Sequence, residues 1–585
     1  MLKSIFFLLS FLLCLGALLF IPKTDKPVSF IRSMVICYMT ELCLGALIAF
    51  PLSLLSISIN LGSMGCVYLL LALCFLFYSF RKKQIQCYYF DIYDLITSLF
   101  LLCFILIVIW RVFSFQLDLT YYNSDPGVHF KNAMEIVRTG DLGRMYFAPL
   151  YNALFIELLE PFFSGIYAYK GFIIADSLSN YMAGMVFYTL ISSFTNSSKI
   201  KKLSPIITIL YFAGWPLYNY VLGGFVYWGI GVTLIAFGIY LLRLYQEYKN
   251  QRPYILMLLA LTLYNIAMCY MLFIPYAAAL FILTLIFLSW DKIKQINKKT
   301  LIGICAGVLL LCVGVFLFAF FNFFKGNLKN MLSALSTDGG IHLSFYRDFI
   351  FFLPLAAYAC GKIKKEKTFR FNLFLLAAYL FMIGASLVLC FSGIMSSYYY
   401  YKLYYLLWLL FWLVTVDALS HILKESCSWF FGYLAMLAFM FVYTFTPVED
   451  LVIKNGLMNY AYTEFPMYSA IGSYVKSPTE TRYDNNFWNV IKTAVGDESC
   501  EPVPLTGAPV DYIYLYWYEA ITGYKCNYVQ TTEKFEEYFI DTRYSDTPAF
   551  AVMKECEYYE KYKKDLAAYP ILFENDFAVI YSTQF

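Results

Sequence analysis

Repeated long apolar runs constrain the fold of this 585-residue chain more than any other feature. Runs of the ~17–25 residues that cross a hydrocarbon core recur along it. The composition agrees, because 61% hydrophobic residues, 14% charged residues and a mean hydropathy of +0.64 exclude a soluble globule with a polar exterior. We predict an α-helical polytopic membrane protein with about 13–14 transmembrane helices, near residues 4–21, 30–57, 62–80, 93–113, 168–195, 203–222, 224–243, 253–272, 274–290, 301–321, 345–360, 371–391, 403–421 and 428–446.

Lysines and arginines cluster between alternate predicted spans, and short cytoplasmic loops are the ones that keep such clusters. The clusters fall on one side of the membrane, at 81–83, 199–202, 243–252, 292–299 and 362–370. Four segments are then on the outer face of the cell membrane: the loop with Asp125, 322–344, 398–402 and the tail from 447. Residues 149–165 must form an interfacial helix, which Glu157 and Glu160 favour because a lipid-facing carboxylate is costly. The net charge of +4 reflects this bias and gives no support for nucleic-acid binding.

The composition divides the chain into two predicted domains, a transmembrane domain over 1–446 with a large outer loop at 114–167, and a soluble extracytoplasmic domain over 447–585. Patterns in the tail predict a helix at 486–495, a strand at 510–518 and a closing strand at 577–581, so we expect a small α/β or α+β fold. An oxidising exterior would permit one disulfide among Cys500, Cys526 and Cys556, with Cys500–Cys526 preferred, although spacing alone does not fix the pairing.

A polar insertion at 121–131 holds Asp125 and His129 where one predicted span ends. If a helix starts near Pro126, His129 lies one turn after Asp125. Asp125 in front of a proline is commonly only a helix cap. A carboxylate at the membrane surface can also deprotonate an acceptor hydroxyl, with a neighbouring group to tune it, so we predict Asp125 and His129 as the catalytic pair.

A second candidate is the tyrosine-rich segment 396–405, at the outer end of a span. Tyrosines gather at membrane interfaces, so an aromatic belt explains most of it. Lys402 is a cation among these phenols and is suited to bind a lipid-linked phosphate. In the loop at 337–348, which has turn chemistry, Arg347 is the best second phosphate contact.

The sequence indicates no metal or cofactor. It has only three histidines, at 129, 342 and 421, and no CxxC or His-x-x-x-His spacing, so a zinc cage is not expected. No glycine-rich phosphate loop is present, and Gly223-Gly224 is better explained as a break between two spans.

The layout resembles the GT-C superfamily of polytopic glycosyltransferases, in particular uncharacterised bacterial members with a C-terminal extracytoplasmic domain. Three features carry the resemblance: the acidic outer loop with Ser-Asp-Pro-Gly-Val-His at 124–129, the Tyr-Phe-Ala-Pro-Leu-Tyr stretch at 146–151 opening a juxtamembrane helix, and the tyrosine-rich loop ending in Lys402. Many GT-C enzymes carry paired acids in the first loop, whereas here Asn123 stands two residues before a single Asp125. That departure argues against a metal.

The resemblance implies an inverting transfer of a sugar from a polyprenyl-phosphate donor to a hydroxyl of a cell-surface glycan, lipid or protein. Asp125 would take the acceptor proton, and His129 would orient the acceptor or contact the donor phosphate. Lys402, Arg347 and Tyr401 would bind the donor phosphate. The expected substrate-binding residues are Tyr122, Asn123, Tyr399, Asp338 and His342.

Two other classes stay open. A transporter or flippase would fit the breaks at Gly223-Gly224 and Pro275, because discontinuous helices line many transport sites. However, only Glu41 and Asp176 are prominent acids within spans, which gives no carboxylate chain for proton coupling. A membrane scaffold that displays its tail would leave Asp125 and Lys402 unexplained.

Overall fold

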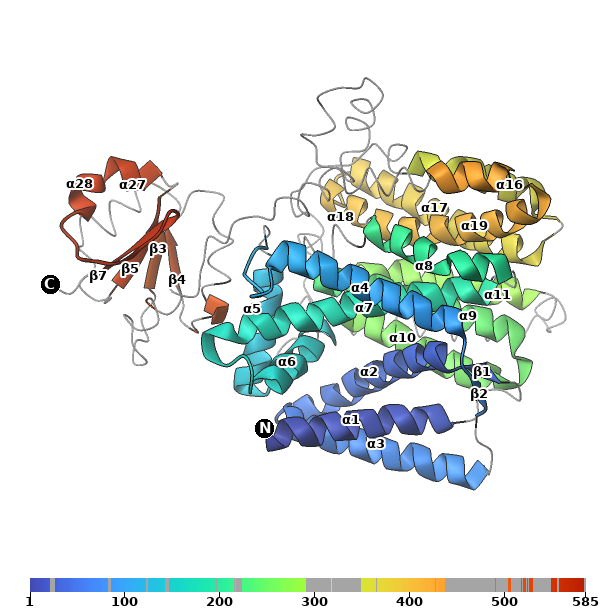
Figure 1. The fold of residues 1–585 in the computed structure, drawn as a ribbon, viewed down its shortest axis with the longest axis horizontal. Coiled ribbons are helices and arrows are strands. Elements are labelled where there is room, and N and C mark those ends of the chain that lie inside the picture. Colours follow the sequence, from blue (N-terminus) through green and yellow to red (C-terminus); the bar gives the residue numbers. More distant parts are fainter. Residues whose placement is uncertain are drawn as a thin grey trace, which may run out of the picture.

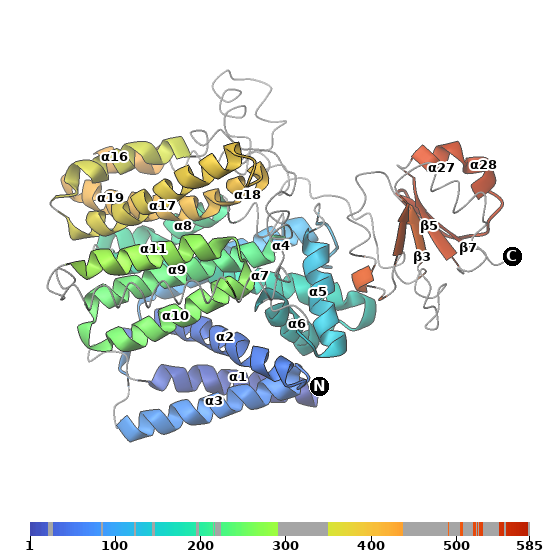
Figure 2. The ribbon, with the colours of Figure 1, turned by 180° about the vertical axis from the view of Figure 1, so that it is seen from behind.

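A computed structural model of the chain describes residues 1–21, 27–82, 86–121, 125–142, 147–194, 198–214, 216, 224–290, 317, 349–364, 366–426, 428–436, 490, 503–506, 517, 519–521, 523, 526–529, 549–554 and 557–582. Most of these residues form helices that lie side by side in one bundle, and a small sheet stands at one end of it (Figures 1 and 2). The predicted fold class, a helical polytopic membrane protein with a small α/β or α+β domain at the C-terminus, is confirmed.

The first four helices coincide with the first four predicted spans: α1 (Leu2–Phe20), α2 (Phe30–Leu54), α3 (Leu61–Lys82) and α4 (Ile92–Phe113). Two of them begin at side-chain caps, because the Arg32 N–H donates to the Ser29 hydroxyl at the start of α2 and the Tyr93 N–H donates to Asp91 at the start of α4. Two short parallel strands, β1 (Val28–Ser29) and β2 (Tyr88–Tyr89), join the ends of α2 and α4.

Two short helices follow α4 at the end of the bundle that faces the C-terminal sheet: α5 (Asp125–Thr139) and α6 (Phe147–Leu159) (Figures 1 and 2). Helix α5 buries Pro126, His129, Phe130 and Ala133, which recur at helical spacing along one side. At 13 residues, α6 is about 20 Å long and cannot cross a core of about 30 Å. This length agrees with the prediction that 149–165 does not span the membrane.

The rest of the bundle consists of α7 (Ala168–Phe194), α8 (Ser198–Ala213), α9 (Val226–Glu247), α10 (Arg252–Cys269), α11 (Phe273–Leu288), α16 (Leu353–Lys362), α17 (Lys367–Phe391), α18 (Ser397–Lys402) and α19 (Tyr404–Glu425). The bundle also contains three short 3-10 turns: η1 (Gly165–Tyr167), η3 (Lys249–Gln251) and η4 (Ile350–Phe352). Among the described residues, eight helical segments are long and apolar enough to cross a membrane: α1, α2, α3, α4, α9, η3 with α10, α17, and α18 with α19. The predicted span at 345–360 is corrected, since α16 has ten residues and begins at Leu353. The span at 301–321 lies outside the described residues apart from Leu317.

The C-terminal sheet has the strand order β4-β3-β5-β7-β6 and mixes parallel and antiparallel pairs. Its elements are β3 (Val503–Thr506), β4 (Cys526–Val529), β5 (Ala549–Met553), α27 (Glu557–Lys561), α28 (Lys563–Leu566), β6 (Ile571–Glu574) and β7 (Ala578–Ser582). The predicted closing strand at 577–581 is confirmed by β7, and the predicted strand at 510–518 is wrong at Trp517, which lies in a helical turn. Of the predicted helix at 486–495, only Val490 is described, and it is helical.

Candidate functional site

Helix α5 begins at Asp125, which agrees with the predicted start near Pro126. Its first turn lies against Gly224, just before α9. Gly224 has a φ of +62°, and a Cβ added there would lie 2.4 Å from Cγ of Pro126. Glycine is therefore required at this position for both its conformation and its size. The predicted break at Gly223-Gly224 thus brings the start of α9 against the helix that carries Asp125.

His129 is buried one turn further along α5. Its ring stacks on Tyr227, with 3.8 Å between ring centroids, and Asn132 on the next turn donates to the Tyr227 hydroxyl over 3.1 Å. The imidazole also makes a hydrogen bond to the backbone of Gly224. The other ring nitrogen, Nδ1, has no hydrogen-bond partner among the described residues. A buried polar atom in this state can accept a hydrogen bond from a substrate.

Lys402, the last residue of α18, is buried within a group of rings from three parts of the chain. We call this group the Lys402 cluster. Its rings lie at the following distances from Lys402 Nζ to their centroids: Tyr398 4.0 Å, Trp228 5.0 Å, Tyr270 5.4 Å, Tyr399 5.5 Å and Phe225 5.6 Å. A cation over several ring faces is stabilised by their quadrupoles. The tyrosines of α18 therefore enclose a charge, which an aromatic belt facing lipid does not require.

Asp125, His129 and Lys402 are electrostatically coupled. Burial raises the pKa of the Asp125 carboxyl above its usual range, and the positive charge of Lys402 lowers it in part. Burial, and then the charge of Lys402, lower the pKa of His129 from 6.5 to about 3. His129 is consequently a neutral imidazole at physiological pH, and Asp125 is a stronger proton acceptor than an exposed aspartate.

The structure brings together four of the residues predicted from sequence: Asp125, His129, Lys402 and Tyr399. The ring of Tyr401 lies near Tyr404 and Tyr405, with centroids 5.9 and 6.5 Å away. The other predicted site residues lie outside the described residues: Tyr122, Asn123, Asp338, His342 and Arg347.

Sequence reasoning missed the rings that α9 and α10 contribute, above all Trp228 and Tyr270. Trp228 also packs on Tyr405, with 3.6 Å between ring centroids, and its indole Nε1 has no hydrogen-bond partner among the described residues. A signal was available, because Phe225, Tyr227 and Trp228 follow directly on Gly223-Gly224. An aromatic run at a helix break marks a bundle end, but its partners depend on packing.

Two further features bear on what the site can bind. Within the described ranges, no group of three or more His, Cys, Asp or Glu side chains is placed to hold a metal ion. Cys526 lies in β4, whereas Cys500 and Cys556 lie outside the described residues, so the disulfide stays a prediction.

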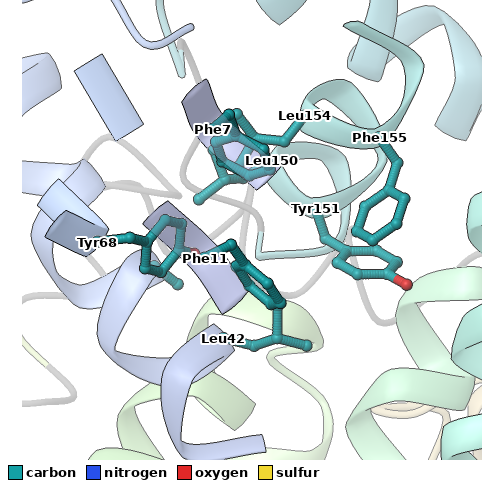
Figure 3. Close-up of a pocket in the computed structure, with 9 residues that line it drawn as sticks. Phe7, Phe11, Leu42, Tyr68, Leu150, Tyr151, Leu154 and Phe155 are labelled. Carbon is teal, nitrogen blue, oxygen red and sulfur yellow. The ribbon is translucent and has the colours of Figure 1, made fainter. Parts of the chain in front are cut away.

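A small pocket between α1, α2, α3 and α6 lies apart from this group of residues (Figure 3). Apolar and aromatic side chains line it, among them Phe7, Phe11, Leu150 and Phe155. Neither Asp125, His129 nor Lys402 lines the pocket, and no charged side chain does. It is a packing space between helices, and the polar groups of its lining side chains are the hydroxyls of Tyr68 and Tyr151.

Solved structures of an oligosaccharyltransferase from Archaeoglobus fulgidus are similar to this chain at low identity. The apo form is 11% identical, with a TM-score of 0.44 over 76% of this chain and 64% of that one. The complex with zinc and sulfate is 11% identical, with a TM-score of 0.41 over 78% of this chain and 68% of that one. The form tethered to an acceptor peptide with an NVT sequon is 10% identical, with a TM-score of 0.42 over 75% of this chain and 64% of that one. This chain thus spans about two thirds of the length of the archaeal protein, and no functional residue is carried over. No protein-family model matches the sequence, and no curated protein sequence is significantly similar to it.

Proposed function

We propose that this protein is a glycosyltransferase of the GT-C type. It moves a sugar from a polyprenyl-phosphate donor to a hydroxyl of a cell-surface glycan, lipid or protein, on the outer face of the cell membrane. The transfer inverts the anomeric centre and needs no metal.

One observation carries the proposal. A carboxylate, a neutral imidazole and an ammonium group, each predicted from sequence for this chemistry, meet at one end of a membrane bundle although Lys402 lies in the second half of the chain. Chance packing gives little reason to bury Lys402 and to half-bury Asp125 beside it, because removing charged groups from water is expensive. The neutral Nδ1 of His129 and the indole Nε1 of Trp228, both without partners among the described residues, add polar atoms that a bound substrate would satisfy.

The residues suggest a division of roles in the transfer. Asp125 takes the proton of the acceptor hydroxyl while the acceptor oxygen bonds to the anomeric carbon. The bond from that carbon to the phosphate oxygen breaks, and the electron pair leaves with the lipid phosphate. Lys402 offsets the negative charge that develops there. Because His129 is neutral, it suits orientation of the acceptor hydroxyl better than binding of an anion.

The test is to incubate the purified full-length protein with a panel of polyprenyl-phosphate sugars and a mixture of glycan, lipid and peptide acceptors. We expect release of polyprenyl phosphate that depends on both donor and acceptor, and continues in EDTA. Movement of intact donor across vesicle membranes without cleavage would identify a flippase instead. Loss of transfer on chelation, with recovery on adding a divalent cation, would overturn the metal-independent mechanism.

A separate experiment tests whether the site lies on the outer face of the membrane. Glu135 is exposed on α5 and Lys424 is exposed near the end of α19, toward the opposite end of the bundle. A cysteine at Glu135 should react with an impermeant thiol reagent in intact cells, and a cysteine at Lys424 should react only after lysis. The reverse pattern would place the site in the cytoplasm.

A further inference from the structure

A short segment of the C-terminal domain packs on α5 of the transmembrane domain. This segment, which we call the Trp517 turn, consists of Trp517, Glu519–Ile521 and Gly523. In both views it is a single orange turn next to α5, separate from the strands (Figures 1 and 2). Its best-buried side chain, Trp517, is only 1% exposed.

Among the described residues, the ring partners of Trp517 belong to the transmembrane domain. It stacks on Tyr121, just before α5, with ring centroids 5.7 Å apart and an interplanar angle of 14°. It also contacts Phe130 of α5 at 5.6 Å and Phe172 of α7 at 6.4 Å. The tyrosine is itself fixed, because its hydroxyl donates to Asp176 of α7 over 3.4 Å. An aromatic anchor buried in a pocket of this kind contributes strongly to an interface.

Polar contacts hold the same helix at two more points. The Glu519 carboxylate forms an ion pair with Lys131, a residue 388 positions away in the sequence. Two turns along α5, the Arg138 guanidinium donates to the Ala520 carbonyl over 2.8 Å. Gly523, next to this guanidinium, has a φ of +81°, a left-handed backbone conformation that glycine adopts without strain. The turn therefore fixes α5 along its length.

The contacts with the Trp517 turn and the proposed catalytic residues lie on different sides of α5. Each residue advances a helix by about 100°, so Asp125, His129 and Asn132 share one side. Lys131 and Arg138 share another side, roughly opposite the first on the same geometry. On the first side α5 meets Tyr227 and the charge of Lys402, and on the second it meets the Trp517 turn. The helix that carries the proposed base is thus held between two parts of the protein.

We propose that the Trp517 turn is a positioning element, through which the C-terminal domain holds Asp125 and His129 against the Lys402 cluster. Trp517 and Glu519 are positioning residues that act through α5 and do not touch the substrate. This role rests on the proposed glycosyl transfer, whereas the contact itself does not.

The contact is tested without any activity measurement. Cysteines replacing Lys131 and Glu519 in the full chain should be joined by a short bismaleimide, and mass spectrometry should identify the linked peptides. The matched control replaces Lys131 and Lys563, since Lys563 lies in α28 on the far side of the sheet from α5 (Figures 1 and 2). Equal linking in both pairs, or none in the first, would overturn the contact.

The positioning role is tested by kinetics. Lys131→Glu and Glu519→Lys should each lower kcat per folded molecule about tenfold, because a small misplacement of Asp125 slows the transfer. The donor KM should stay unchanged, because Lys402 is not displaced. The double variant Lys131→Glu with Glu519→Lys should recover most of kcat. Trp517→Phe should retain more of kcat than Trp517→Ala. The control Lys563→Glu should leave kcat unchanged. A purely structural contact would lower the yield of folded protein and leave kcat per folded molecule unchanged, which would overturn the role. If the wild type transfers no sugar, the proposed function fails, and the cross-link still decides whether the contact exists.

Discussion

The two ends of the helix bundle both bury charged side chains, but the hydrogen-bond partners of these side chains differ. At one end Asp94 accepts hydrogen bonds from the Ser29 and Tyr188 hydroxyls and forms an ion pair with Arg32 over 3.0 Å. The Arg32 guanidinium also donates to the Tyr89 hydroxyl over 2.8 Å. At the other end the Lys402 ammonium lies among rings, and Nδ1 of His129 lacks a hydrogen-bond partner among the described residues.

This difference separates a structural network from a candidate site. A buried charge whose neighbours satisfy it completely joins helices and has no capacity left for a ligand. The Asp94 network joins α2, α4 and α7 in this way. Polar atoms left without partners cost free energy, and a bound substrate that pairs with them removes that cost. Substitutions at the Asp94 end should therefore change stability, and those at the Lys402 end should change chemistry.

The largest effect should come from Asp125→Asn. Asparagine still allows a helix to start but cannot accept the proton. We expect transfer to fall by roughly 10²- to 10⁴-fold with folding and membrane insertion unchanged. The matched control is Asp141→Asn, after α5, where the carboxylate accepts from the Ser53 hydroxyl over 2.7 Å. Near-normal transfer by the Asp125 variant would leave this residue only the role of starting the helix.

At the opposite end, Asp94→Ala should destabilise the protein by about 3 kcal/mol, because it removes the buried carboxylate that pairs with Arg32 over 3.0 Å and leaves the guanidinium only the longer contact to Asp91, at 4.0 Å. Thermal unfolding in detergent measures this loss, and transfer per folded molecule should not change. Glu425→Ala removes an ion pair with Lys362 at the surface and should cost much less. A fall in kcat for the Asp94 variant would show that the two ends are not independent.

Lys402→Gln should weaken use of the donor by about tenfold in KM, since a hydrogen bond to a charged group is worth roughly 1.5–3 kcal/mol. Lys402→Arg should recover part of the loss because the charge returns with a different geometry. Lys424→Gln, at an exposed position of α19, serves as the control. Identical donor kinetics in wild type, Gln and Arg variants would leave Lys402 as a partner of Asp125 only, and the phosphate contact would then be sought at Arg347.

The smallest expected effect concerns the pH profile of transfer. Only deprotonated Asp125 can act as the base, so the rate should fall as pH drops through its raised pKa. His129, with a pKa of about 3, should add no limb between about pH 5 and 9. Because the charge of Lys402 lowers the pKa of Asp125, Lys402→Gln should move the acid limb to higher pH. An unmoved limb would show that the titrating group is not Asp125.

Local sequence patterns were sufficient to predict the fold class and the part of the site that α5 carries. Apolar length predicts a membrane span wherever it occurs, because the hydrocarbon core has a fixed thickness. The helix that starts at Asp125 and carries His129 one turn later also follows from nearby residues, since caps and helical spacing act over a few positions. The strand β7 was predicted for the same reason.

Tertiary packing decided everything that joins distant parts of the chain. The meeting of Lys402 with Asp125, and the rings of Trp228 and Tyr270 around it, depend on which helix ends come together, and no local pattern encodes that choice. Trp517 shows the same limit, because the segment 510–518 was predicted as a strand, whereas the ring stacks on Tyr121 and contacts Phe130 of α5 and Phe172 of α7. Local propensity is weak, and burial of a large aromatic side chain in another domain overrides it.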